Sequence, residues 1–147
     1  MTDAPTEPMT EDAVFELLSL ECRVDFDGTA RYYNTQGQLH RLYGPAVEQS
    51  DGSRSWCQNG VLHRPDGPAV ERPNGYRAWW QNNCLHRLDG PAIEYSDGSR
   101  EWFQNGQLHR VDGPAFVGVD GSCEWYINGK ELTKAEWQQQ VTSMGSV

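Results

Sequence analysis

The sequence predicts a mainly β protein: an elongated array of antiparallel β-hairpins, about 4.5 repeats long, with a short capping helix at each end. Leu-His-Arg occurs four times at a spacing of 23 residues, so the chain is a tandem repeat. Asp-Gly or Asn-Gly steps return with the same period, and such steps are typical of tight hairpin turns. Both flanks of the repeats carry helix-start signals.

The repeated unit extends well beyond the tripeptide. The segment Arg54 to Glu71 returns as Arg77 to Glu94 and, slightly altered, as Arg100 to Val117. A degenerate first copy runs from Arg31 to Glu48, and a truncated last copy, 123–130, stops before any His-Arg. Identical units present the same side chains at intervals along one surface, whereas catalysis needs different groups at one point. The repetition therefore favours a binding surface over an enzyme.

The turn residues suggest how the strands pair. In each unit we expect a two-residue hairpin turn, at Asp51-Gly52, Asn74-Gly75, Asp97-Gly98 and Asp120-Gly121. Folding at these turns would pair an aliphatic or aromatic residue with a tryptophan, as Val47 with Trp56, Val70 with Trp79, Ile93 with Trp102 and Phe116 with Trp125. A second turn follows each tryptophan, at Asn59-Gly60, Asn105-Gly106 and Asn128-Gly129. One apolar stripe should then run along the array.

The chain divides into four parts. We expect an acidic, disordered leader over residues 1–9, a helix over 10–21, the repeat array over 22–132, and a capping helix and tail over 133–147. The first helix, with Thr10 as its cap, should place Val14, Leu17 and Leu18 on one face. The last should begin at a capping box of Thr133 and Glu136 and reach about Val141. Covering the open sheet edges is the simpler role for both helices; binding a partner or dimerising is the alternative.

The charge is unevenly distributed. Of the net charge of −9, residues 1–27 carry −7, so the array itself is close to neutral. An acidic leader and a neutral array would not attract phosphate backbones, which argues against direct binding of nucleic acid. No stretch approaches the ~18 apolar residues of a membrane helix, and the acidic N-terminus does not resemble a secretory signal. A cytoplasmic protein is expected.

Two rows of arginines recur with the repeat. Beside each histidine lies an arginine that could hold a phosphate or carboxylate, giving possible anion-binding residues His40, Arg41, His63, Arg64, His86, Arg87, His109 and Arg110. The alternative is structural, because in three copies an aspartate follows two residues later, as Asp66, Asp89 and Asp112. Tyr43 replaces it in the first copy. A second row, Arg31, Arg54, Arg77 and Arg100, is expected to stack on the aromatic stripe.

Positions that vary between copies are candidates for recognition. One variable row reads Asn34, Cys57, Trp80, Phe103 and Tyr126, and becomes aromatic toward the C-terminus. Strand alternation would expose Trp80, Phe103 and Tyr126 as a ridge that suits a protein partner, with Glu101 and Glu124 from a second variable row beside it. A terminal helix packed over these residues is the alternative.

The repeat resembles a known family. Trp-x-x-Asn-Gly, a histidine turn and then an Asp-Gly step, at 23 residues, is similar to the MORN-variant (MORN-like) β-hairpin repeats of bacterial and phage proteins. The resemblance covers roughly residues 27–130 and rests on Asp51-Gly52, Asn59-Gly60, His63 and Gly67. It implies a scaffold or recognition surface, in the manner of bacterial antitoxins or phage proteins. Arg-x-Asp-Gly-Pro-Ala after the histidine departs from the common repeat and argues against lipid binding.

Taken together, the sequence predicts a non-catalytic protein-interaction module that inhibits one macromolecular partner by steric occlusion, as an antitoxin or a phage-encoded anti-defence inhibitor would. No catalytic residue, metal site or cofactor is expected, since the histidines repeat identically and Cys22, Cys57, Cys84 and Cys123 form no Cys-x-x-Cys pair. Two alternatives stay open: a small-anion or nucleotide sponge that uses the His-Arg rows, and a self-assembling repeat protein.

Overall fold

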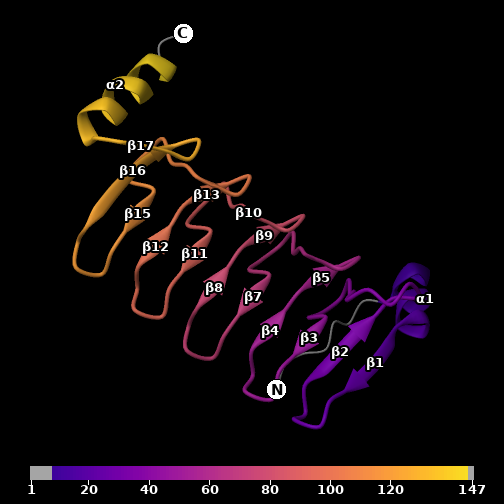
Figure 1. Ribbon diagram of the computed structural model, residues 1–147. Helices are drawn as coiled ribbons and strands as arrows, with labels where there is room; N and C mark the ends of the chain where they lie inside the picture. Colours follow the sequence, from indigo (N-terminus) through magenta and orange to yellow (C-terminus); the bar gives the residue numbers. More distant parts are fainter. Residues whose placement is uncertain (1–7, 146–147) are drawn as a thin grey trace.

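Antiparallel hairpins follow one another along the array in the computed structural model, which describes residues 8–145 (Figure 1). The main sheet has eleven strands. In order across the sheet they are β1 (Glu21–Val24), β2 (Ala30–Tyr33), β3 (Val47–Glu48), β4 (Arg54–Ser55), β7 (Val70–Glu71), β8 (Arg77–Ala78), β11 (Ile93–Glu94), β12 (Arg100–Glu101), β15 (Phe116–Val117), β16 (Cys123–Ile127) and β17 (Lys130–Leu132). The predicted fold class, a mainly β hairpin array with a helix near each end, is confirmed.

Three short hairpins line one side of this sheet (Figure 1). They pair β5 (Cys57–Gln58) with β6 (Val61–Leu62), β9 (Trp80–Gln81) with β10 (Cys84–Leu85), and β13 (Phe103–Gln104) with β14 (Gln107–Leu108). Each is closed by the second turn of its repeat. Asn59 and Gly60 both have positive φ, 49° and 83°, as a two-residue hairpin turn requires. The equivalent Asn82-Asn83 forms the same turn without glycine, at 49° and 64°.

The turns of the main sheet differ from the prediction by one residue. At Asp97-Gly98 the loop holds three residues, since the Tyr95 amide bonds to the Ser99 carbonyl and only Gly98 has positive φ. The Asp97 carboxylate accepts from the Ser99 amide at 2.8 Å and favours this loop. Consequently Ile93 pairs with Glu101 and not with Trp102. Val47, Val70 and Phe116 are shifted in the same way, to Ser55, Ala78 and Glu124.

That one-residue shift separates the aliphatic row from the tryptophans, because neighbouring residues of a strand face opposite sides. The predicted single apolar stripe is therefore wrong. One row across the sheet runs through Val47, Ser55, Val70, Ala78, Ile93, Glu101, Phe116 and Glu124. The neighbouring row alternates in charge through Glu48, Arg54, Glu71, Arg77, Glu94 and Arg100.

The core is thin and built on small residues. Ala46, Ala69, Ala92 and Ala115, one per repeat, are fully buried. Each stands before a strand, and its carbonyl accepts a backbone hydrogen bond from the aromatic residue in or directly after the neighbouring strand, as Ala69 does from Trp56 at 2.8 Å. No large side chain among residues 8–145 is fully buried. Stability must therefore come from contacts between the repeats as much as from a central core.

The first repeat contains one extra residue. Its hairpin turn spans Asn34 to Gly37, so His40 stands eight positions after Tyr32, whereas His63 stands seven positions after Trp56. Tyr32 therefore occupies the place of Trp56, and Tyr33, not Asn34, occupies the place of Cys57. The hydrogen bonds agree, because the His40 amide donates to the Tyr32 carbonyl as the His63 amide donates to that of Trp56.

Helices stand at both ends of the array. Helix α1 (Glu11–Ser19) has the predicted Thr10 cap, whose hydroxyl accepts from the Ala13 amide at 3.2 Å. Its predicted face is wrong: Val14, Leu17 and Leu18 are exposed, while Ala13 and Glu16 are buried. Glu16 faces the array, where its carboxylate accepts from the Leu42 amide. The predicted leader, residues 1–9, lies outside the described residues except for its last two.

Helix α2 (Lys134–Gly145) has the predicted capping box. The Glu136 carboxylate accepts from the Thr133 amide at 2.8 Å, and the Thr133 hydroxyl accepts from the Glu136 amide at 3.2 Å. The helix continues past Val141, where the sequence signal ended, to Gly145. It contacts β16 and β17, the last two strands of the sheet (Figure 1).

Candidate interaction sites

The arginine beside each histidine lies flat on an aromatic ring. The guanidinium carbons of Arg64, Arg87 and Arg110 are each 3.9 Å from the ring centroids of Trp56, Trp79 and Trp102, and that of Arg41 is 4.0 Å from Tyr32. A glycine backs each guanidinium on its other side. A methyl group added at Gly90 would lie 2.8 Å from the Arg87 guanidinium carbon, closer than atoms approach. Only glycine therefore leaves room for the stacked arginine.

Hydrogen bonds hold these guanidinium groups in place. Arg87 donates to Asp89 at 3.0 Å, to the Pro91 carbonyl at 3.0 Å and to Glu94 at 3.4 Å. The three predicted arginine–aspartate pairs are confirmed, at 3.4, 3.0 and 2.8 Å for Asp66, Asp89 and Asp112. Arg41, for which the sequence offered no partner, pairs with Glu48 at 2.9 Å. These contacts support the structural interpretation of the His-Arg rows.

The second arginine row is not the one that stacks. Arg54, Arg77 and Arg100 are exposed and stand opposite glutamates across the sheet, and Arg31 pairs with Asp25. The expected stacking is therefore wrong for this row. In the second repeat, for example, Arg54 lies two residues before Trp56 but does not cover its ring. Arg64, which follows His63 in the loop, stacks on that ring instead.

Each histidine joins one repeat to the next. The Nδ1 atoms of His40, His63, His86 and His109 accept from the backbone amides of Asn59, Asn82, Asn105 and Asn128, at 2.9 to 3.1 Å. Because Nδ1 accepts, the neutral imidazole carries its proton on Nε2. The sequence showed that the histidines and the Asn-Gly turns recur with the same period. It did not show that each histidine accepts a hydrogen bond from the turn of the next repeat.

Replacing His86 with alanine should lower the free energy of unfolding by about 1 kcal/mol, because the Asn105 amide loses its partner at a site that water reaches. His86→Asn offers a side-chain oxygen near the same place and should recover part of the loss. Urea denaturation of both variants checks this. Equal stability of wild type and His86→Ala would contradict the assigned role.

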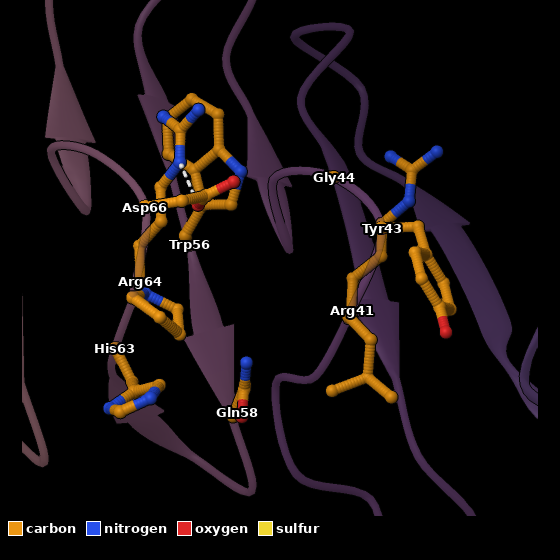
Figure 2. Close-up of a pocket in the computed structure, with 10 residues that line it drawn as sticks. Arg41, Tyr43, Gly44, Trp56, Gln58, His63, Arg64 and Asp66 are labelled. Atoms are coloured by element: carbon orange, nitrogen blue, oxygen red, sulfur yellow. Dashed lines mark hydrogen bonds and ion pairs between the residues drawn. The ribbon is translucent and has the colours of Figure 1, made fainter. Parts of the chain in front are cut away.

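Three equivalent grooves lie between successive His-Arg loops. The first, of about 370 Å³, has loop residues 41–44 on one side and Trp56, His63 and Arg64 on the other (Figure 2). The second, about 520 Å³, lies between residues 65–68 and the unit of His86. The third, about 340 Å³, lies between residues 87–90 and the unit of His109. Figure 2 shows Arg64 stacked on Trp56, with Asp66 bonded to it at the rim.

The terminal helices occupy the corresponding positions at the two ends. At the start, Glu16 of α1 accepts through Oε1 from the Leu42 amide, and the same oxygen lies 3.8 Å from His40 Nε2. At the end, Trp137 of α2 donates through Nε1 to the Arg110 carbonyl at 2.9 Å. The Nζ atom of Lys134 lies over the Trp125 ring, 5.8 Å from its centroid, where the other repeats have a stacked arginine. Both helices thus act as end caps, the simpler of the predicted roles.

The predicted aromatic ridge is less exposed than expected. Trp80, Phe103 and Tyr126 are half-buried, and the Trp80 indole nitrogen is buried without a hydrogen-bond partner. Their strands bond to the neighbouring loops, since the carbonyls of Trp80, Phe103 and Tyr126 accept from the amides of Arg64, Arg87 and Arg110. The main contacts of α2 are with β16, which contains Tyr126, and with β17, not with the strands of Trp80 and Phe103.

Two carboxylates lie beside this ridge, the half-buried Glu101 and the exposed Glu124. Glu101 and Glu124 flank Phe116 on adjacent strands. Burial raises the pKa of Glu101, the hydrogen bond from Tyr95 opposes this, and the charge of Glu124 raises it again, so the net pKa is above its usual range. Burial and the nearby Glu101 raise the pKa of Tyr95 to about 12. No arginine or lysine pairs with either glutamate within residues 8–145.

We use the name acidic aromatic patch for Tyr95, Glu101, Phe116, Glu124 and Tyr126. The Tyr126 hydroxyl lies 3.3 Å from a Glu124 oxygen and can donate to it. In the preceding repeats the positions of Glu101 and Glu124 hold Ser55 and the fully buried Ala78. The sequence showed that these positions vary between repeats. That Glu101 and Glu124 lie on either side of Phe116 became clear only from the strand register of the structure.

Neither a family model, nor a curated protein, nor a solved structure matches this chain. Within residues 8–145, histidine, cysteine, aspartate and glutamate form no group of three or more that could hold a metal ion. A helix long and apolar enough to cross a membrane is also lacking in that part of the chain.

Proposed function

We propose that this protein is a non-catalytic interaction module that binds a protein partner through the acidic aromatic patch and blocks that partner sterically. The observation that carries the proposal is the half-buried Glu101, which has Glu124 as a neighbour and pairs with no arginine or lysine among residues 8–145. An ionised carboxylate that is half-buried and unpaired lowers the stability of the folded state. A role in binding a partner would explain why a glutamate stands at this position.

The patch suits a cationic, partly apolar surface. An arginine of the partner could pair with both carboxylates and lie against Phe116 or Tyr126, and it would relieve the repulsion between the two glutamates. The patch is therefore expected to attract basic protein segments and to repel nucleic acid. An inhibitor of the antitoxin or phage anti-defence kind, acting in the cytoplasm, fits a surface of this type.

The anion-sponge alternative receives less support. Such a site would need free guanidinium groups, yet Arg64, Arg87 and Arg110 are stacked on indoles and bonded to carboxylates or carbonyls. Self-assembly remains a candidate that light scattering over a range of concentrations would detect as a rising mass.

The partner is sought by affinity capture of the tagged protein from a bacterial lysate, with mass spectrometry of bound proteins. The control is the Glu101→Gln, Glu124→Gln variant, which keeps the size of both side chains. A stoichiometric protein held by the wild type and weakened at least tenfold by the variant would support the proposal. A nucleotide as the sole captured species would overturn it in favour of the sponge.

The single variant Glu101→Gln should make the protein more stable at pH 7. A carboxyl group whose pKa is raised by folding stabilises the folded state while it is protonated, and that contribution is lost as pH rises through the folded pKa. The variant should therefore exceed the wild type in free energy of unfolding at pH 7, and the difference should vanish below the ordinary value of 4.5. Urea denaturation at pH 4 and pH 7 measures this. A less stable variant at pH 7 would contradict it.

A further inference from the structure

We propose a second interaction surface: the second and third grooves bind carboxylates from an acidic α-helix of a partner protein, in the way that α1 binds the start of the array. This surface shares no residue with the acidic aromatic patch, so either proposal can fail alone. The grooves are those lined by Leu88 and Val111 in their loops.

Helix α1 shows the mode of binding within this chain. Its side toward the array presents Ala13 and, one turn later, Glu16, both buried. The small alanine lets the helix approach closely, and Glu16 accepts from the Leu42 amide beside His40 Nε2. The first His-Arg loop therefore supplies one hydrogen-bond donor, the Leu42 amide, and places the imidazole Nε2 of His40 3.8 Å from the same carboxylate oxygen.

The same backbone amide and imidazole nitrogen recur in the later loops, where neither contacts a carboxylate among residues 8–145. Leu88 and Val111 stand where Leu42 stands, and neither amide has a hydrogen-bond partner within the described chain. The Nε2 atoms of His86 and His109 are likewise unpaired, while their Nδ1 atoms are used. Leu88 and Val111 are 75% and 48% exposed, so an apolar helix face would gain contact at the groove rim.

The second loop differs in one informative residue. Pro65 stands in the place of Leu42, so the first groove lacks the backbone donor, yet the loop keeps its shape and Arg64 its stacking on Trp56. Proline at this position is therefore compatible with the fold. It also means that two adjacent grooves, the second and third, can take a carboxylate with both donors.

The distance between these grooves constrains the partner. Two strands per repeat at about 4.8 Å place successive grooves about 10 Å apart. A helix rises about 10 Å in seven residues, or two turns. A partner helix that lies along the array and reaches both grooves would therefore carry Ala-x-x-Glu, as in Ala13 to Glu16, repeated once at a spacing of about seven residues. Arg87 and Arg110 are already paired with Asp89 and Asp112. The partner's carboxylate would therefore be recognised by the backbone amides and imidazole N–H groups of the loops, not by a net positive charge.

The test uses a fluorescent helical peptide of about 20 residues with two Ala-x-x-Glu steps seven residues apart, and its matched Gln peptide. Fluorescence anisotropy gives the affinity for the full-length protein, and NMR follows the amides of Leu88 and Val111. We expect the Glu peptide to shift both amides. The Gln peptide, and the protein variants Leu88→Pro and Val111→Pro, should each bind about tenfold more weakly.

Several results would overturn the proposal. These are no binding of the Glu peptide, equal binding of the Gln peptide, or unchanged affinity of both proline variants with folded far-UV spectra. A fourth is a dimer of the free protein that Leu88→Pro dissociates, which would make a second copy of this chain the occupant. Glu101→Gln should leave peptide binding unchanged, so the outcome is independent of the acidic aromatic patch.

Discussion

Replacing Arg87 with methionine should lower the free energy of unfolding by about 3 kcal/mol. The variant loses the stacking of the guanidinium on Trp79, worth about 1 kcal/mol, and the bonds to Asp89, Glu94 and the Pro91 carbonyl. Methionine fills much of the space of the arginine side chain. The loss of stability therefore measures the contribution of the guanidinium group and not that of a cavity. Urea denaturation with linear extrapolation measures it.

Arg110 provides a matched comparison within the same protein. It stacks at the same 3.9 Å on Trp102 and pairs with Asp112, but the position of Glu94 is held by Val117 in its repeat. Arg110→Met should therefore cost about 1 kcal/mol less than Arg87→Met. Arg87→Lys should fall between wild type and Arg87→Met, because an ammonium cannot cover the ring and reach three acceptors together. Equal stability of Arg87→Met and wild type would show that the row is dispensable and available to a ligand.

The fold class was predictable because it follows from repetition and turn residues. The 23-residue period, the Asn-Gly turns and the capping box of Thr133 each depend on local chemistry that one sequence displays. The strand register was not predictable from the same signals. Asp97-Gly98 is compatible with a two-residue and a three-residue loop, and the choice moves every cross-strand partner to the opposite face.

The interaction sites were predictable only in part. The arginine–aspartate pairs lie two residues apart and were visible in the sequence, whereas Arg41 and Glu48 meet because the loop folds back onto its following strand. Contacts between repeats, such as that of His86 with the Asn105 amide, depend on how one unit stacks on the next. The extra residue of the first copy also misaligned Asn34 with Cys57, since a fixed period cannot detect a one-residue insertion in a turn.

Replacing Trp137 with alanine should release helix α2 and lower the free energy of unfolding by about 2 kcal/mol. Its ring is half-buried at the end of the array, and its Nε1 donates to the Arg110 carbonyl at 2.9 Å. In a repeat array each unit is stabilised by its neighbours, so loss of a cap should act first on the adjacent strands β16 and β17. Hydrogen exchange should accelerate there and in α2 before it does in β7 or β8.

Trp137→Phe separates the ring from its hydrogen bond. It keeps most of the apolar contact and should cost about 1 kcal/mol, which corresponds to the lost bond to Arg110. Uniform acceleration of exchange across all strands in Trp137→Ala would contradict a local cap and would mean that the array unfolds as one unit. Faster exchange confined to the C-terminal strands would show that the end helix acts as a local cap on β16 and β17.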